Sequence, residues 1–351
     1  MNAAASGRMK FSVVCSQDMA VPDAVKLWQT CEDAGLDMIG VVDSPTVFRE
    51  LYVAATLAAT GTKRAQVMTY VTNPLTRHPA VTAGAMLSLN ELAPGRIAMG
   101  IGTGDSAAWS VGLKPATVAR IRDYILTVKA LLRGERVTWD GQSFEPVWSR
   151  FQPFDLPVYV AAAGPKVLTM AAEVADGAVV GVGFSADDIA GASAIIAAGL
   201  KSSGRSADRF DTWWNARVVF ADSVAEAERL SLGWYPVWLT MGTLEGKNIP
   251  RDFEAKVKAL NADAHDVRAA YRTPGRDKLI VERAKELGIY DWLMARSPRI
   301  FGTPADIARR LGELRDQGLA NWVLIAMGPT PTTPKTDLIA SLARDVLPRL
   351  R

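Results

Sequence analysis

The sequence predicts an α/β fold, a (β/α)8 barrel in which eight parallel strands alternate with helices. Short and almost wholly apolar segments, such as residues 66–71 and 97–101, are typical of parallel strands buried on both faces. Between these two, apolar residues recur at helical spacing, at Ala80, Ala83, Met86, Leu87, Leu89 and Leu92. Turns rich in Gly, Pro and Asn separate the segments. This strand–helix–strand pattern continues along the chain.

Eight strands are expected to account for the barrel wall. They cover residues 9–15, 36–42, 66–71, 97–101, 156–162, 178–182, 213–220 and 321–327. Helices are expected at residues 22–34, 49–60, 80–92, 115–132, 167–175, 305–317 and 336–350, and Ser185 is expected to cap another. Pro22 and Gly35 mark typical boundaries, because proline suits a first helical turn and glycine the position after the last. Residues 134–144 contain Asp140-Gly141 and predict a small β-hairpin.

A long insertion interrupts the repeat between strands seven and eight. It spans roughly residues 231–300 of a chain, 1–351, that we treat as one domain. Helices are expected between strands seven and eight at 224–232, 253–262 and 278–287. The insertion's aromatic residues are Trp234, Tyr235, Trp238, Tyr271, Tyr290 and Trp292. They predict either a wall or lid over a ligand pocket, or the core of a helical subdomain or subunit interface.

Composition excludes several classes of function. The net charge is +3, with 40 basic and 37 acidic residues interspersed, so neither a nucleic-acid nor a membrane-surface role is indicated. No apolar stretch reaches the length of a membrane span or signal peptide, so we expect a cytoplasmic protein. The two cysteines, Cys15 and Cys31, and the two histidines, His78 and His265, predict neither a disulfide framework nor a metal site.

Five turns at the carboxyl ends of strands could form a ligand site, because ligands bind at that end of such folds. They are Asp43-Ser44-Pro45, Thr72-Asn73-Pro74, Gly102–Ser106, Ala163–Lys166 and Gly181-Val182-Gly183. Small residues there let a ligand approach backbone amides closely. Ala162, Ala163 and Gly164 precede a helix start and predict a phosphate cradle, to which Lys166 could add charge. Each turn alone would also suit a plain strand-to-helix connection, but five together favour a site.

Acid–base groups are few at these turns. Asp105 is the best-placed acid, although a helix-capping aspartate would look the same. Asp43 has the same two interpretations, as site acid or turn cap. His78 lies at a helix start, where ordering the turn is favoured over proton transfer. A site of glycines and small polar residues without a metal suits a cofactor that supplies the chemistry.

Three motifs form a recognisable set: VTNPLTRHPA at residues 71–80, PGRIAMGIGTGD at 94–105 and PVYVAAAGPK at 157–166. Together they resemble the bacterial luciferase-like family, which comprises flavin- or deazaflavin-dependent oxidoreductases on a TIM barrel. The resemblance implies a non-prolyl cis peptide at Tyr70-Val71 behind the cofactor ring, with Thr72 and Asn73 along its polar edge. It places Gly102, Thr103, Gly104 and Asp105 against the ring or ribityl chain, with Ser106 and Asp43 nearby. Ala162, Ala163, Gly164 and Pro165, with Gly181, Val182 and Gly183, would hold the phosphate.

The motifs look most like the deazaflavin-dependent methylenetetrahydromethanopterin reductase branch, but two positions depart from it. That branch and the deazaflavin-dependent sugar-phosphate dehydrogenases carry Asp-His where this chain has Asp43-Ser44. The sugar-phosphate enzymes also carry a glutamate at the end of strand one, where this chain has Cys15-Ser16-Gln17. Both departures weaken the expectation of a dehydrogenase base.

We therefore expect a flavin-dependent monooxygenase that uses reduced FMN from a separate flavin reductase, and O2, to oxygenate a small organic substrate. Asp105, Ser44 and His78 are its candidate catalytic residues. One alternative is a deazaflavin (coenzyme F420)-dependent reductase or dehydrogenase that transfers a hydride. Another is a non-catalytic flavin-binding protein, whose pocket would be filled by the insertion's aromatic residues. The resemblance also implies a homodimer or homotetramer.

Overall fold

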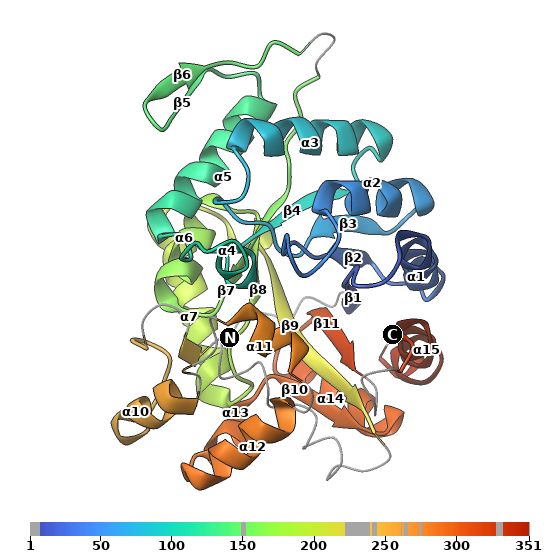
Figure 1. Cartoon of the computed structure of the whole chain (residues 1–351), viewed down its shortest axis with the longest axis vertical. Helices are drawn as coiled ribbons and strands as arrows, with labels where there is room; N and C mark the ends of the chain where they lie inside the picture. The colour runs from blue at the N-terminus through green and yellow to red at the C-terminus, as the bar shows by residue number, and fades with distance from the viewer. Residues whose placement is uncertain are drawn as a thin grey trace.

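The computed structural model describes residues 8–148, 152–221, 239–240, 244–260, 262, 266–273, 276–327 and 333–350. Within them one parallel sheet runs in the order β10-β9-β11-β1-β2-β3-β4-β7-β8, and an additional pairing of β9 with β8 closes it (Figure 1). Eight of its strands are the predicted ones: β1 (Lys10–Cys15), β2 (Met38–Val41), β3 (Gln66–Thr69), β4 (Ile97–Ile101), β7 (Val158–Ala162), β8 (Gly177–Val180), β9 (Asp211–Phe220) and β11 (Asn321–Met327). The fold is therefore a (β/α)8 TIM barrel, as predicted.

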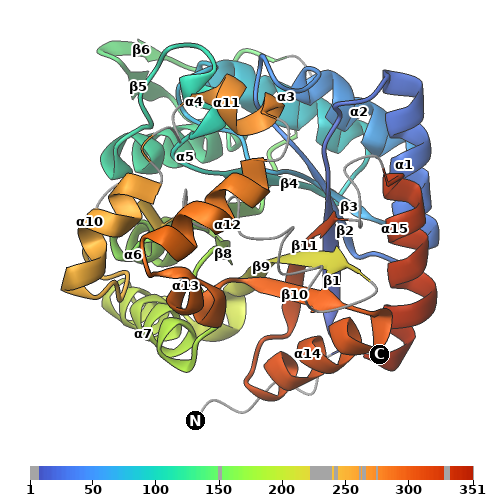
Figure 2. The same ribbon diagram turned by 60° about the horizontal axis from the view of Figure 1, so that its bottom comes forward.

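Helices surround the strands (Figure 2). They are α1 (Val21–Asp33), α2 (Leu51–Gly61), α3 (Pro79–Leu92), α4 (Ser106–Trp109), α5 (Val118–Leu132), α6 (Pro165–Val174), α7 (Ala186–Ser202), α14 (Pro304–Asp316) and α15 (Lys335–Ser341). Ser185 caps α7 as predicted, since its Oγ accepts the Asp188 N–H at 3.2 Å. The start expected for α5 at Pro115 is wrong. The helix begins after Thr117, whose hydroxyl accepts the Arg120 N–H and so satisfies an otherwise unpaired donor.

One strand of the sheet, β10 (Arg299–Gly302), was not predicted. It pairs in parallel with residues 217–220 of β9, whereas β8 pairs only with residues 211–214 of that strand. Because β9 is ten residues long, it extends beyond β8. The edge of its carboxyl-terminal half is therefore left with backbone groups that β8 does not pair. The short segment β10 fills that edge.

We call the end of the barrel at which the strands' carboxyl ends lie the mouth. Below the mouth, side chains fill the barrel interior. Buried residues from six different strands meet there: Met38, Met68, Ala98, Tyr159, Trp213 and Val323. Glycine is required where the wall is tightest, since a Cβ on Gly100 would lie 2.1 Å from the Thr69 carbonyl oxygen. The floor of the barrel is thus solid, and ligand space is left to the mouth.

The described part of the insertion contains α10 (Arg251–Leu260), α11 (Val267–Arg272), α12 (Arg276–Glu286) and α13 (Tyr290–Arg296). Three of these helices, α10, α12 and α13, bury a small core of their own around Val257, Ala284 and Leu293. Tyr290 and Trp292 pack against that core, which favours the subdomain interpretation for these two aromatic residues. Trp234, Tyr235, Trp238, His265, the Tyr271 side chain and the helix expected at 224–232 lie outside the described residues.

The predicted hairpin forms from β5 (Val137–Trp139) and β6 (Gln142–Phe144) and projects at the top of Figure 1. Asp140 and Gly141 have φ values of 48° and 78°, the left-handed pair that a two-residue hairpin turn needs. No helix among the described residues is long and apolar enough to cross a membrane. The described residues also contain no group of three His, Cys, Asp or Glu side chains placed to hold a metal ion.

Candidate active site

The structure brings three of the predicted turns together at the mouth. They follow β2, β3 and β4, which are neighbours in the sheet. The Thr72 N–H donates to the Gly100 carbonyl and the Gly102 N–H donates to the Thr72 carbonyl, both at 2.9 Å. The Tyr70-Val71 peptide bond is cis, as the resemblance implies. Backbone hydrogen bonds therefore fix the turns after β3 and β4 relative to one another.

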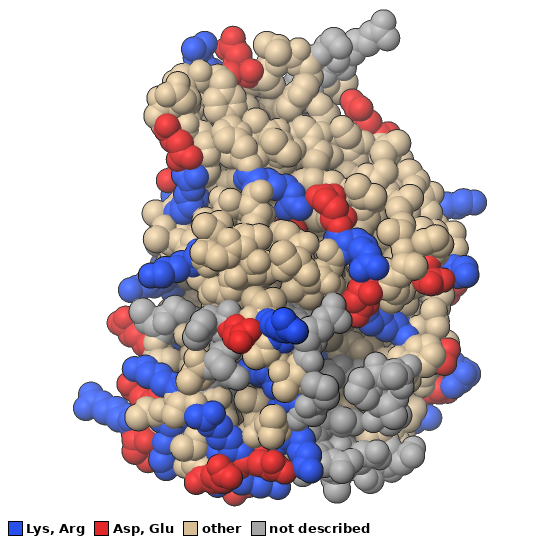
Figure 3. Space-filling view, viewed as in Figure 1, with Lys and Arg blue, Asp and Glu red and all other residues tan. Residues whose placement is uncertain are grey.

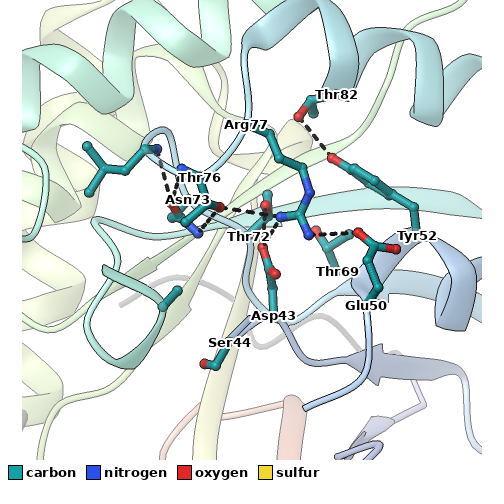
Figure 4. A network of polar contacts seen from close by, with 12 residues as sticks. Asp43, Ser44, Glu50, Tyr52, Thr69, Thr72, Asn73, Thr76, Arg77 and Thr82 are labelled. Carbon is teal, nitrogen blue, oxygen red and sulfur yellow. Dashed lines mark hydrogen bonds and ion pairs between the residues drawn. The ribbon is translucent and has the colours of Figure 1, made fainter. Parts of the chain in front are cut away.

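Asp43 connects the turn after β2 to the turn after β3 (Figure 4). Its Oδ2 atom accepts the Thr72 hydroxyl at 2.9 Å and the Arg77 guanidinium at 2.7 Å. The second terminal nitrogen of Arg77 donates to Glu50 at 2.8 Å. Burial by itself lowers the pKa of the Arg77 guanidinium, but the charge of Asp43 outweighs this and raises it above its ordinary value. Asp43 is thus a buried carboxylate paired with a cation.

Ser44, Ser106 and Asp105 form a chain of hydrogen bonds at the same end. The Ser44 and Ser106 hydroxyl oxygens are 2.7 Å apart and both side chains are buried. The Ser106 hydroxyl donates to Asp105 Oδ1 at 3.1 Å, so the Ser44 hydroxyl is left to donate to Ser106. Asp105 also caps α4 through the Ser106 N–H. Asp105 is thus a helix cap, its role as the site acid stays a prediction, and two of the candidate catalytic residues are linked through Ser106.

Glycines keep the turn after β4 close to the turn after β3. Gly104 has a φ of +82°, and a Cβ there would lie 3.1 Å from Asn73 Cβ, while a Cβ on Gly102 would lie 3.0 Å from Val71. The intervening Thr103 accepts the Ala116 N–H through its carbonyl at 2.7 Å. The Asn73 carboxamide accepts the N–H groups of Leu75 and Thr76, so this side chain holds its own turn. These close approaches leave backbone, rather than bulky side chains, along this part of the mouth.

Tyr70 contributes a phenol inside the barrel. Burial raises the pKa of its hydroxyl above the ordinary value, the Arg217 charge lowers it, and the Asp105 charge raises it. Tyr70 is therefore protonated at neutral pH and remains a hydrogen-bond donor.

The predicted phosphate cradle is a cavity of about 220 Å³ at the ends of β7 and β8. Ala163, Pro165 and all three residues of Gly181-Val182-Gly183 line it. The neighbouring Ala162 is buried, and its carbonyl accepts the Gly181 N–H at 2.9 Å, which joins the two turns. Gly164 is the N-cap of α6 and, having no side chain, caps none of the first N–H groups of that helix. This arrangement suits an anion.

The lysine that lines this cavity is Lys247, from the insertion, rather than Lys166. The Lys166 side chain is exposed, and its ammonium lies 4.0 Å from Glu245. Lys247 is 7% exposed and its Nζ donates to the Leu239 carbonyl at 3.0 Å. Burial lowers the pKa of Lys247 to about 8. Its ammonium is still mostly protonated at neutral pH.

A buried ion pair fixes this part of the insertion to the barrel. Arg296 and Asp188, both lining the cavity, lie 2.6 Å apart and are almost fully buried. Arg296 also donates to the backbone carbonyls of Lys247 at 2.8 Å and Asn248 at 2.9 Å. The Asp188 charge is therefore already paired, and Lys247 supplies positive charge to the cavity. Sequence reasoning missed these residues because no local motif marks them and they come from distant segments.

His78 lies away from this chemistry. It is exposed and caps α3, its Nδ1 accepting the Ala80 N–H at 3.2 Å. Its ring centroid lies 5.4 Å from that of Phe144 and 6.4 Å from that of Trp139, both on the hairpin. This geometry supports the turn-ordering interpretation of His78.

The residues at the mouth fit a cofactor with a flat ring and a phosphate-bearing tail. The ring would lie against the backbone of the glycine-rich turns, where added Cβ atoms would crowd the neighbouring strand end. The phosphate would meet the α6 N-terminus and Lys247 in the cavity. The two regions are the ends of adjacent strands, since β4 pairs with β7 and β7 with β8.

Comparisons with known proteins identify the family of this chain. The sequence profile of the luciferase-like monooxygenase family matches residues 8–321. The chain belongs to this family and is an oxidoreductase of the luciferase-like class.

Three similar proteins are informative. A 5,10-methylenetetrahydromethanopterin reductase of Archaeoglobus fulgidus is 28% identical over 98% of this chain and 100% of its own length. An F420-dependent glucose-6-phosphate dehydrogenase of Kineococcus radiotolerans is 34% identical over 60% of this chain and 67% of its own. The solved coenzyme F420-dependent tetrahydromethanopterin reductase of Methanopyrus kandleri has a TM-score of 0.72 and 21% identity, covering 98% of this chain and 100% of that one.

Proposed function

We propose that this protein is a deazaflavin (coenzyme F420)-dependent oxidoreductase that transfers a hydride between the deazaflavin and a small organic substrate. The observation that carries the proposal is the similarity to the Archaeoglobus fulgidus reductase, which extends over 98% of this chain and all of that protein. The F420-dependent dehydrogenase of Kineococcus radiotolerans supports the same cofactor. We therefore prefer the deazaflavin alternative to the FMN monooxygenase, which was expected because Asp43-Ser44 and Cys15-Ser16-Gln17 depart from the deazaflavin branches.

The roles of the residues follow from the geometry at the mouth. The glycine-rich turns Gly102–Gly104 and Gly181–Gly183 would hold the ring and phosphate of the cofactor, with Lys247 opposite the phosphate. When bound, the deazaflavin supplies two-electron hydride chemistry. The Ser44, Ser106 and Asp105 chain can hold a proton at Ser44 Oγ or pass it to the Asp105 carboxylate, which is half-buried and reaches the mouth.

One observation favours a second candidate, a monooxygenase that uses reduced FMN from a separate reductase. Ser44 is a buried hydroxyl bonded to Ser106, where the deazaflavin branches carry a histidine. A hydroxyl is a weak base, and oxygenation by a reduced flavin depends more on a dry pocket than on a strong base. The non-catalytic alternative has less support, because Tyr290 and Trp292 pack in the insertion's own core.

Anaerobic turnover with both cofactors tests the proposal. We expect reduced deazaflavin to be oxidised in the absence of oxygen by a substrate with an electrophilic carbon, such as a carbonyl or iminium compound. The variant Ser44→Ala should slow this reaction without weakening cofactor binding, because Ser44 lies in the proton chain. Oxygen-dependent consumption of reduced FMN with product formation, and no reaction of the deazaflavin, would replace this proposal with the second candidate.

The protein would act as a homodimer or homotetramer. The surface over α3 is largely uncharged, whereas charged side chains crowd the region of α10 and α12 (Figure 3). Exposed apolar residues on neighbouring helices add to it: Val53 on α2, Val81 and Leu92 on α3, and Leu126 on α5. An uncharged face of this kind is typical of an interface between subunits. Light scattering of the purified protein measures the oligomeric state directly.

A further inference from the structure

Arg77 is held from several sides at the edge of the mouth. One terminal nitrogen donates to Asp43 and the other to Glu50, at 2.7 and 2.8 Å. The guanidinium carbon lies 4.9 Å from the centroid of the Tyr52 ring. The Arg77 carbonyl accepts the Tyr124 hydroxyl at 3.2 Å. Contacts from α2 and α5 thus fix both the side chain and the backbone of this residue.

A chain of hydroxyls makes this arrangement rigid. The Tyr52 hydroxyl donates to the Thr82 hydroxyl at 2.9 Å (Figure 4). The Thr82 and Tyr124 hydroxyl oxygens are 2.5 Å apart. Since Tyr124 donates to the Arg77 carbonyl, the chain runs in one direction from Tyr52 through Thr82 to Tyr124. Burial raises the pKa of Tyr124 to about 12, so this hydroxyl keeps its proton. The aromatic ring beneath the guanidinium and the carbonyl behind it therefore have fixed positions.

Held in this way, Arg77 contacts Asp43. The Asp43 side chain is 2% exposed and that of Arg77 13%, whereas the Glu50 side chain is 48% exposed. A carboxylate so buried needs a counter-charge, and Arg77 is the cation that contacts it. Arg77 and Thr72 both donate to the Oδ2 atom of Asp43. Among the described residues, none donates a hydrogen bond to the other oxygen, Oδ1.

We propose that Arg77 is a positioning residue: it holds the Asp43 carboxylate by Oδ2 and so presents Oδ1 to an N–H or O–H group of the bound cofactor ring. Asp43 follows β2 and bonds to Thr72, next to the turn of Tyr70 and Val71, so its carboxylate belongs to the region assigned to the ring. The inference rests on the proposed function for the identity of that ring. The competing interpretation is that Arg77 only fastens the turns and that Asp43 never contacts the cofactor.

A double-mutant cycle distinguishes the two interpretations. The four proteins are wild type, Arg77→Met, Asp43→Asn and the combined variant, each titrated with oxidised deazaflavin while its absorbance spectrum is recorded. We expect Arg77→Met to weaken binding about tenfold or more, the size of one lost hydrogen bond to a charged group. In the Asp43→Asn background the same change should have little further effect, because Arg77 acts through that carboxylate. Arg77→Lys should restore most of the affinity and the spectrum of the bound ring.

Two matched controls separate positioning from general stability. Glu50→Gln removes the charge of the exposed partner of Arg77 and leaves the contact with Asp43. Arg120→Met removes an arginine that likewise pairs with a carboxylate, Asp140, and lies 3.8 Å over the Trp139 ring, but outside the mouth. Both should bind the deazaflavin like wild type.

The outcomes are distinct. Equal affinity of Arg77→Met and wild type, or losses that add in the combined variant, would overturn the positioning role while leaving the proposed function intact. If wild type binds FMN but no deazaflavin, the proposed function fails, and the same cycle with FMN still decides the role of Arg77. A wild-type protein that binds neither cofactor would contradict both.

Discussion

Replacing Lys247 by methionine should stabilise the protein and weaken its anion site at the same time. Lys247 is 7% exposed, and burial lowers its pKa from 10.5 to about 8. Keeping this buried ammonium charged at pH 7 therefore costs about 3 kcal/mol relative to the unfolded chain. Its hydrogen bond to the Leu239 carbonyl returns roughly 1 kcal/mol of that cost. Methionine has a similar shape and no charge, so Lys247→Met should raise the free energy of unfolding by about 2 kcal/mol.

The pH dependence has a definite sign. Between about pH 8 and 10.5 the unfolded chain still binds the lysine proton, whereas the folded protein has released it. The stability of wild type relative to Lys247→Met should therefore rise across this window, and the advantage of the variant should disappear near its upper end. Urea unfolding at pH 7, 9 and 10.5 measures the difference.

The affinity of Lys247→Met for phosphate and cofactor should fall, although its stability rises. Loss of the ammonium should weaken inorganic phosphate or cofactor binding by about tenfold or more, because a charge-assisted contact is removed. Lys166→Met is the matched control, since that lysine lies in the first turn of α6 but its side chain is exposed. A variant less stable than wild type at pH 7, or one with unchanged phosphate affinity, would refute this account of the cavity.

Three further predictions concern the predicted site residues. Asp105→Ala should lower turnover by about 100-fold, as expected for loss of an acid–base group. It should cost only about 1 kcal/mol of stability, as a lost helix cap. The same loss of stability with full turnover would restrict Asp105 to capping. Gly164→Val should weaken phosphate binding by about tenfold, because its Cβ would already be in van der Waals contact with Lys247 Cε, at 3.5 Å, and the two methyl groups add bulk beyond it. An unchanged titration would remove Gly164 from the cradle. His78→Ala should cost about 1 kcal/mol of stability through loss of the α3 cap and leave turnover unchanged; a large drop in turnover would return His78 to the catalytic set.

The barrel could be predicted because each strand carries its own signal. The run at 97–101 is apolar throughout and is buried throughout in the structure. Asp140-Gly141 fixed the hairpin because only a few residue types tolerate two successive positive φ values. β10 could not be predicted, since its four residues form a strand only where β9 outruns β8.

The turns of the candidate site could be predicted from the sequence, but the charged side chains around its cavity could not. The turns after β2, β3 and β4 carried visible small and polar residues, and the structure places Asp43 against Thr72 and Ser44 against Ser106. The cavity at α6 depends on Lys247, which lies about eighty residues further along the chain in a segment without a motif. Contacts of this kind depend on tertiary packing rather than on local pattern.

Parallel anaerobic titrations of the purified protein with coenzyme F420 and with FMN test the central claim most directly. We expect the deazaflavin to bind more tightly, and Lys247→Met to weaken its binding while Lys166→Met leaves it unchanged. Tighter binding of FMN, or binding of the deazaflavin that is indifferent to Lys247, would contradict the assignment of this mouth and cavity to a deazaflavin and its phosphate.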